Sequence, residues 1–438
     1  MKRLIIPAIF LWLGINAVQA QTRLSIEDCR RMALENSDDI RISSRQVDKA
    51  VSDRQAAKTA WFPKISGSAT YAYIFENIDM GMEMDLSAMG GTGTVPIPME
   101  ISMKGMYMAG ITLQQPVYAG GKIVNANKMA KTGVAISEEN KRLTRINTLV
   151  EVEQAYWMYV SVAEKVKLLT QYTQLLDSLH QQVNSFFELE MATAQDLHKV
   201  RTRRSNVTYE LQRAESGREL TRMSLCHLIG LELDAQIIAT DTLILTQNYN
   251  NQLSHDIANR PEYRILEMQV ELKDLEIKNT RADFLPAVGI SAGYQYMGGM
   301  KLAGSSLDMK IPMVMASISI PIFNFGEGRK KIRSARLAHE ISTVELNKNR
   351  SLMDIEAQQS KSAYESALLL IRTAEHGLKE SEHNLSQTQN SYEMRMATIL
   401  EVMEAQTQWQ EAYSNNIEAR TNYKIREIEY LRAIGRLE

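Results

Sequence analysis

The sequence predicts a mainly helical protein with a small β part, built from two copies of one unit. Three observations predict this fold class. Two long tracts contain no proline and have the composition of helices, four short segments near the prolines alternate like strands, and one seven-residue pattern occurs twice, 205 residues apart. Each copy is therefore expected to form a long-helix hairpin and two strands, which gives four strands per chain.

Long helices are expected where proline is absent. The nine prolines leave residues 117–260 and 322–438 without one, and both tracts are rich in Ala, Glu, Gln, Lys, Arg and Leu. Apolar residues recur at three- and four-residue spacing, as at Leu337, Ile341 and Val344, which indicates amphipathic helix. A helix over 122–187 is roughly 100 Å long, which predicts a rod, a bundle or a conduit.

Four segments of about ten residues alternate between apolar and small or polar side chains. They cover about 64–75, 106–116, 287–296 and 314–322. In the first segment, Ile65 and Tyr71 fall on one face and Ser66 on the other. This alternation, with tyrosines near the strand ends, is typical of transmembrane β-strands of the outer-membrane barrel type. An ordinary half-buried antiparallel sheet is the alternative.

Alignment of the two copies places their length difference between the strands of the first copy. Pro116 aligns with Pro321 at the offset of 205, whereas Pro63 aligns with Pro286 at an offset of 223. The extra 18 residues fall within 76–106, where an external loop tolerates insertion. These offsets predict two repeats, 21–254 and 255–438. The first repeat ends, after its return helix, in residues 231–254, which we call the equatorial segment.

Residues 1–20 have the features of a secretory signal peptide. Lys2 and Arg3 precede an apolar stretch, and small residues end it at Val18 and Ala20. Cleavage is expected before Gln21, with export from the cytoplasm. No cysteine follows the proposed cut directly, so lipid anchoring there is not indicated.

Charge, cysteine content and motifs exclude several classes of function. The 50 Lys and Arg residues balance 52 Asp and Glu residues along the whole chain, so no nucleic-acid-binding surface is expected. Cys29 and Cys226 could form one disulfide in an oxidising compartment, but two buried free thiols are favoured. Because the sequence contains no recognisable catalytic or nucleotide-binding motif, neither an enzyme nor a cofactor is expected.

Four strands are too few to close a barrel, because the smallest single-layer barrels have about eight. An open sheet in a membrane leaves backbone groups without hydrogen bonds, at several kcal/mol each. Other copies of the chain are therefore expected to complete the barrel, and a ring of three chains gives a twelve-stranded barrel with a shared helical tube. Two or four chains satisfy the same physical argument.

Several stretches occur in an order and doubled spacing that resemble one known family. They are the secretory signal, LSIEDCRRMALENSDDI (24–40), QPVYAGGK (115–122) and YEMRMATILEVMEAQTQWQEAY (392–413). Over about 22–437 the chain resembles the TolC family of outer-membrane efflux channels. This resemblance implies a homotrimer, a trimeric α/β-barrel channel in the outer membrane with an α-helical tunnel across the periplasm. It also implies passive, gated efflux or type I secretion together with a periplasmic adaptor protein and an inner-membrane transporter.

The repeated pattern takes its meaning from this resemblance. FELEMAT (187–193) and YEMRMAT (392–398) are then the helix-to-helix turns at the periplasmic end, where the family channel closes and meets its adaptor. The family usually has a glycine six residues before an acidic residue, where this chain has Glu190 and Arg395. Their opposite charges could pair between hairpins. Adaptor docking is expected at Met191, Ala192, Thr193, Met396, Ala397 and Thr398.

The resemblance also implies a gate close to these turns. Asp196 and Tyr392 occupy the positions of a hydrogen-bonding pair that restrains the closed state. Glu401 and Glu404 occupy positions of acidic rings at the entrance, where threefold symmetry brings carboxylates together and favours cations. The position of a gating arginine in the family is occupied here by Ala397. The gate contact of that arginine is therefore either absent or made by Arg395, with Glu190 at the equivalent place in the other turn.

Methionines between the first two strands suggest one alternative. Met80, Met82 and Met84 offer thioethers suited to Cu(I), and related channels export copper and silver, so a Cu/Ag-exporting channel of the same architecture is possible. Flexible apolar filling of a surface loop explains the same residues without a metal. A periplasmic coiled-coil scaffold or adaptor is an alternative of another class, against which the four strand segments argue.

Overall fold

The computed structural model describes residues 22–76, 78–85, 87, 90–243, 256–302 and 305–437. The predicted signal peptide and residues 244–254 of the expected equatorial segment lie outside the described residues. The chain divides into two compact units, which are described separately. Residues 1–45, 139–264 and 348–438 form the helical unit, and residues 46–138 and 265–347 form the sheet unit.

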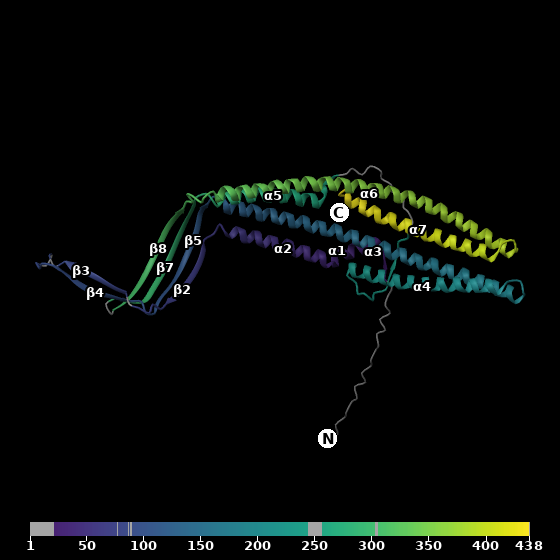
Figure 1. Ribbon diagram of the computed structural model, residues 1–438, viewed down its shortest axis with the longest axis horizontal. Helices are drawn as coiled ribbons and strands as arrows, with labels where there is room; N and C mark the ends of the chain where they lie inside the picture. The colour runs from purple at the N-terminus through teal and green to yellow at the C-terminus, as the bar shows by residue number, and fades with distance from the viewer. Residues whose placement is uncertain are drawn as a thin grey trace, which may run out of the picture. The chain divides into compact units, whose positions relative to one another are not determined.

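The elements follow the expected order of helices and strands in each repeat (Figure 1). In the first repeat they are β1 (Thr22–Leu24), α1 (Ile26–Asn36), α2 (Asp38–Thr59), β2 (Lys64–Ala72), β3 (Ile78–Asp85), β4 (Thr94–Ser102), β5 (Met106–Ala119), α3 (Lys122–Glu188), α4 (Ala194–Ile229) and β6 (Ile237–Ala239). In the second they are η2 (Ile257–Asn259), α5 (Pro261–Ala282), β7 (Ala287–Leu302), β8 (Ser305–Ser319), α6 (Glu327–Glu393) and α7 (Ile399–Ala433).

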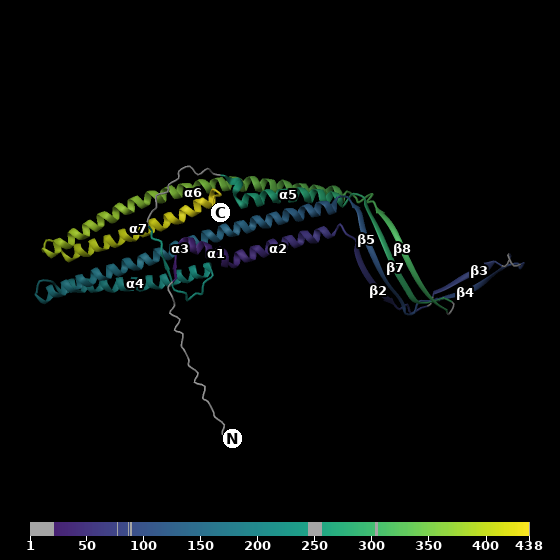
Figure 2. The same ribbon diagram turned by 180° about the vertical axis from the view of Figure 1, so that it is seen from behind.

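The two long helices confirm the duplication. Helices α3 and α6 each contain 67 residues, and both their first and last residues differ by the offset of 205 that the sequence predicts. Each helix turns back into a shorter one, α4 or α7, and the two turns lie at the same end of the helical unit (Figures 1 and 2). The tracts without proline therefore fold as two helical hairpins, as expected.

A continuous apolar core holds the helical unit together. Tyr156 and Tyr172 of α3 are fully buried in it. The Tyr156 hydroxyl donates to Oδ2 of Asp241 at 2.8 Å, and the backbone N–H of Ile26 donates to the same oxygen at 2.7 Å. Next to them, β1 pairs with β6 in parallel, from Thr22 opposite Ile237 to Leu24 opposite Ala239. These bonds attach the start of the described chain to the segment that follows α4.

The two cysteines confirm the prediction of buried free thiols. Cys29 on α1 and Cys226 on α4 are both unpaired and completely buried in the same core. Burial raises the pKa of the Cys29 thiol to about 12. Neither side chain is therefore a reactive thiolate near neutral pH.

The sheet unit contains the four expected strands in the order β2, β5, β7, β8, all antiparallel (Figure 1). Strand β7 pairs with β8 from Ala287 opposite Ser319 to Leu302 opposite Ser305. The described strands differ from the predicted ranges mainly at their ends. Strand β8 begins nine residues before the expected 314 and stops before Pro321, because proline cannot donate to a neighbouring strand.

The expectation of an external loop at 76–106 is wrong for most of that range. The segment forms a hairpin of β3 and β4, paired from Ile78 opposite Ile101 to Asp85 opposite Thr94. Its last residues, Ile101 and Ser102, also pair with Leu302 and Lys301 of β7. The hairpin escaped the sequence analysis because glycines, prolines and methionines interrupt its alternation. It adds two strands to the four that were expected.

The sheet unit exposes much of its apolar surface. Ile65 and Tyr71 on β2 are 72% and 68% exposed, and Val314 and Ile318 on β8 are 81% and 67% exposed. Strands β2 and β8 are the outer strands of the four-strand series. Among the described helices, none combines the length and the apolar character that a bilayer crossing requires.

Candidate functional site

The two helix-to-helix turns form the candidate site, and in each turn a residue other than glycine adopts the left-handed backbone conformation. Glu190 has a φ of 59° and Arg395 a φ of 61°. These are the two positions at which the related family usually has glycine. The turns therefore keep the geometry of a left-handed helix end, although each bears a side chain that this backbone conformation disfavours by about 1 kcal/mol.

Backbone hydrogen bonds explain why these residues are left-handed. In the first turn, the N–H of Met191 donates to the carbonyl of Phe186 at 2.7 Å. In the second, the N–H of Met396 donates to the carbonyl of Ser391, also at 2.7 Å. Such a bond spans six residues and closes the helix end only when the intervening residue takes a positive φ.

The helices that follow the turns start with matching capping boxes. The Asp196 carboxylate accepts from the Thr193 hydroxyl at 2.7 Å, and the Glu401 carboxylate accepts from the Thr398 hydroxyl at 2.9 Å. Each threonine hydroxyl accepts in return from the backbone N–H of its acidic partner. The side-chain bond from Thr193 holds the pKa of Asp196 below its usual value, and the backbone bond from Thr398 does the same for Glu401.

Arg395 joins the second turn to the first. Its guanidinium donates to the Sδ atom of Met191 at 2.9 Å and lies 5.4 Å from the ring centre of Phe186. The Phe186 ring in turn lies 6.1 Å from that of Tyr392. Within the part of the chain that the structure describes, no ion pair joins Arg395 to Glu190, so their pairing stays a prediction for contacts between chains.

Below the turns, six buried side chains from α3, α4 and α7 form a cluster, which we call the tip cluster. Its members are Leu179, Val183, Leu197, Val200, Ile399 and Val402. Ala192 and Tyr392 pack against it. The cluster joins the two hairpins within one chain, so that their turns are held next to each other.

The structure brings the proposed pair Asp196 and Tyr392 close to each other. Burial raises the pKa of Tyr392, and the negative charge of Asp196 raises it further. Among the described residues, however, no hydrogen bond joins the two side chains; Asp196 accepts from Thr193 and, at 3.4 Å, from Lys199. A role of this pair in restraining the closed state stays a prediction.

The remaining predicted residues lie at or near the turn surface. Met191 and Met396 are 53% and 71% exposed, Thr193 and Thr398 are exposed, and Ala192 and Ala397 are half-buried. Glu401 and Glu404 are both exposed on the first turns of α7. Sequence reasoning missed Leu189 and Met394, which extend the exposed apolar surface of the turns. Their signal was the alternation of apolar and charged residues within both seven-residue patterns.

The proposed methionine site is only partly described. Met80, Met82 and Met84 occupy alternate positions of β3, in place of the expected loop. The side chains of Met80 and Met82 lie outside the described residues, while that of Met84 is 47% exposed. Copper binding at these residues stays a prediction.

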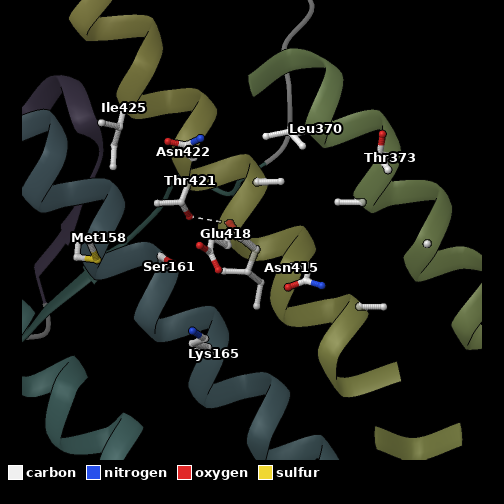
Figure 3. A pocket seen from close by; sticks show the side chains of 15 residues that line it. Met158, Ser161, Lys165, Leu370, Thr373, Asn415, Glu418, Thr421, Asn422 and Ile425 are labelled. Carbon is white, nitrogen blue, oxygen red and sulfur yellow. Dashed lines mark hydrogen bonds between the residues drawn. The ribbon is translucent and has the colours of Figure 1, made fainter. Parts of the chain in front are cut away.

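A cavity of about 780 Å³ lies in the helical unit between α3, α6 and α7 (Figure 3). Met158 and Leu370 supply apolar surface, whereas Lys165 and Glu418 supply opposite charges. Met158 and Leu370 are 46% and 54% exposed. This cavity is separate from the turns and has the mixed character of a surface that packs against another helix.

Comparison with known proteins identifies the family. The model of a family described as outer membrane efflux protein matches residues 30–231 and 253–436. The chain belongs to the outer membrane efflux protein family. The prediction of a TolC-like channel, of its fold class and of its outer-membrane location is thereby confirmed.

Relatives and solved structures agree with this assignment. The chain is 20% identical over 414 residues to the probable outer membrane lipoprotein SilC of Salmonella typhimurium, covering 92% of this chain and 84% of the relative. It is 20% identical over 382 residues to the outer membrane efflux protein BepC of Brucella suis, covering 87% of this chain and 78% of the relative. The CmeC outer membrane channel of Campylobacter jejuni has the same fold, with a TM-score of 0.76, 15% identity and coverage of 94% and 86%.

Membership of the outer membrane efflux protein family decides between the alternatives. The protein is an efflux channel of the outer membrane that extends into the periplasm, and the alternative of a periplasmic scaffold is wrong. Proteins of this family function with periplasmic adaptors and inner-membrane transporters.

Proposed function

We propose that three copies of the chain form the gated outer-membrane channel of a tripartite efflux system. The open sheet supports this proposal most directly, because β2 and β8 leave both edges of the four-strand series free and expose large apolar side chains. In a ring, β8 of one copy can pair with β2 of the next, so that no backbone group faces hydrocarbon unpaired.

The helical unit offers matching surfaces for neighbouring copies. Leu369 and Leu370 on α6 are both exposed, and Leu370 lines the same cavity as Met158 of α3. A contiguous apolar helix face of this kind is expected to pack against another helix. Packing of these faces around a threefold axis gives a closed helical tube.

We infer that the two turns form the closed end of this tube. The Arg395 contact with Met191 and Phe186 holds the turns of one chain together. Asp196 and Tyr392, with Glu190 and Arg395, then restrain the closed state through contacts that include neighbouring chains. Glu401 and Glu404 face the entrance as acidic rings, which favour cations.

The exposed turns are the proposed docking surface for the periplasmic adaptor. Met191 and Met396, with Leu189 and Met394 beside them, provide flexible apolar side chains, which suit an interface that repacks on binding. Adaptor contact is expected to open the channel by competing for the contacts of Asp196, Tyr392 and Arg395. Passage through the channel is proposed to be passive. Among the described residues, no group of three or more His, Cys, Asp or Glu side chains could hold a metal ion.

Conductance of the purified protein in planar bilayers tests this proposal. The wild-type protein is expected to have the mass of a trimer and a small, cation-selective conductance. The double variant Asp196→Asn with Tyr392→Phe is expected to conduct more, because it loses one charge and one hydroxyl. Asparagine still offers an oxygen to Thr193, so that the capping box survives.

The duplication supplies matched controls for the gate. Glu401 is the counterpart of Asp196 at the offset of 205, and Phe187 is the counterpart of Tyr392. Glu401→Gln is expected to reduce cation selectivity without opening the gate. An unchanged conductance in the double variant contradicts the proposed lock, and a monomer without conductance contradicts the channel assembly.

A further inference from the structure

An exposed aromatic segment connects β8 to α6 in the sheet unit. Ile322, Phe323 and Phe325 are 92%, 71% and 93% exposed. The rings of Phe323 and Phe325 contact each other edge to face, with their centres 4.8 Å apart. Such a pair forms a large apolar surface, and exposing this surface to water costs free energy.

The backbone of Phe325 is in an unusual conformation for an aromatic residue. Its φ is 43°, in the left-handed region. At the equivalent position of the first repeat, 205 residues earlier, the chain has Gly120 with a φ of 61°. The turn can therefore form without a side chain, so the phenyl ring is not needed to make it. A strained residue with a fully exposed ring indicates a contact outside the chain.

Next to this segment, three arginines line a cavity of about 1,000 Å³. Arg329, Arg333 and Arg336 are spaced by four and three residues and so lie on one face of α6. Among the described residues, none of the three forms an ion pair. The carboxylate of Glu340 also lines the cavity, which leaves an excess of positive charge there.

The position of this cavity relative to the membrane follows from the strands. Strand pairing brings the start of β2, the end of β5 and the end of β8 to one end of the sheet. Exposed aromatic residues gather at this end, namely Trp61, Phe62, Tyr118, Phe323 and Phe325. Such aromatic residues mark the boundary between hydrocarbon and headgroups in membrane barrels.

The arginines lie within reach of lipid headgroups. The headgroup layer extends roughly 5–8 Å beyond the hydrocarbon on each side. Counted from the start of α6 at Glu327, Arg329, Arg333 and Arg336 lie about 3 Å, 9 Å and 14 Å along the helix axis, and helical side chains point back toward the start of the helix. Long arginine side chains can also reach back toward the interface.

We propose that this cavity binds the headgroup of an anionic phospholipid in the periplasmic leaflet. Arg333 and Arg336 bind the phosphate oxygens with their planar guanidinium groups, which suit bidentate contacts. Phe323 and Phe325 pack against the glycerol and upper acyl region. The exposed position of the rings, the strain at Phe325 and the unpaired arginines then have one common explanation.

The first repeat provides the control. Lys128 and Lys131 are the counterparts of Arg333 and Arg336, are also exposed, and form no ion pair among the described residues. The repeat has Val124 in place of Arg329 and Gly120 in place of Phe325. Removing the two lysines changes the net charge by the same amount as removing the two arginines, without touching the cavity.

Native mass spectrometry of the detergent-purified full-length protein, titrated with cardiolipin, tests the site. Arg333→Gln with Arg336→Gln is expected to weaken cardiolipin binding roughly thirtyfold, from the contribution of two basic groups at an anionic surface. Lys128→Gln with Lys131→Gln is expected to change it less than about threefold, since only general charge is lost. Binding of zwitterionic phosphatidylethanolamine is expected to be unchanged in both variants.

A second variant separates binding from folding. Phe325→Gly relieves the left-handed strain, so it is expected to leave oligomeric mass and thermal stability intact while weakening cardiolipin binding severalfold. Equal losses in the arginine and lysine variants overturn the proposal, as does wild-type affinity in the arginine variant. Loss of the trimer mass in the arginine variant also overturns it, because the cavity is then covered by a neighbouring chain. None of these three results depends on gating at the turns.

Discussion

Glycine substitution at the two left-handed turn residues measures what the Arg395 contact contributes. Glu190 and Arg395 have nearly the same φ, 59° and 61°, so Glu190→Gly and Arg395→Gly relieve nearly the same backbone strain. Relief is worth about 1 kcal/mol at each position. Arg395→Gly also removes the guanidinium from the Phe186 ring, a contact worth about 0.5–1 kcal/mol at an exposed site.

The two variants are therefore expected to differ. Glu190→Gly should slow local opening of its turn about fivefold, which corresponds to about 1 kcal/mol. Arg395→Gly should leave the opening of its turn within about twofold of wild type, because gain and loss nearly cancel. Adding Phe186→Leu and Met191→Leu removes both contacts of the guanidinium, after which Arg395→Gly is expected to show the full slowing of about fivefold.

Amide hydrogen exchange followed by mass spectrometry measures this opening. The reporting amides are those of Met191 and Met396, whose N–H groups donate at 2.7 Å across the turns and exchange only when these bonds open. Equal slowing by both glycine substitutions refutes the stabilising role of the Arg395 contact. No slowing by Glu190→Gly refutes the assignment of strain to the left-handed backbone.

Three further predictions concern the helical unit. The folded-state pKa of Asp196 is lowered, so its contribution to stability is present above the unfolded pKa of about 4 and is lost as the pH falls through the folded pKa. The backbone amides at the start of α4 should therefore exchange faster below about pH 4, after correction for intrinsic exchange rates. Thr193→Ala should cause the same loss of stability, about 1 kcal/mol, at pH 7. A pH-independent exchange rate contradicts the capping argument. Cys29 and Cys226 should resist alkylation at pH 8 until the protein unfolds, since burial raises both pKa values; rapid labelling of the folded protein means that the core opens. Arg30→Met should destabilise the protein by about 3 kcal/mol, measured by thermal unfolding, because the buried Glu153 then loses its cationic partner, and adding Glu153→Leu should restore most of the loss.

The sequence predicted the features that depend on local composition and on internal comparison. The absence of proline located α3 and α6, and one offset of 205 matched both ends of these helices. The same offset identified Glu190 and Arg395 as equivalent residues, which the structure confirms by their shared left-handed conformation. Local rules succeed here because a helix and its end are determined by nearby residues.

The features that sequence reasoning missed depend on residues far apart in the chain. The β3–β4 hairpin lacks regular alternation and is fixed by pairing of Ile101 and Ser102 with β7. The contact of Arg395 with Met191 joins residues 204 positions apart, and no periodicity indicates it. For Asp196 and Glu401, the threonine three residues earlier already predicts a capping box, whereas the family resemblance predicts only a role in the gate.

The free edges of β2 and β8 also affect how the channel can be made in the cell. Within the described residues, β2 and β8 each have one unpaired edge and exposed apolar side chains, and such edges can pair with other strands. An isolated chain is thus a hazardous intermediate during transit through the periplasm. In the proposed trimer, formation of the sheet is expected to accompany membrane insertion and pairing with neighbouring chains, because the exposed edges favour aggregation and proteolysis before that step. The yield of assembled channel is consequently expected to fall when chains are exported faster than they assemble, because unassembled chains then accumulate and aggregate.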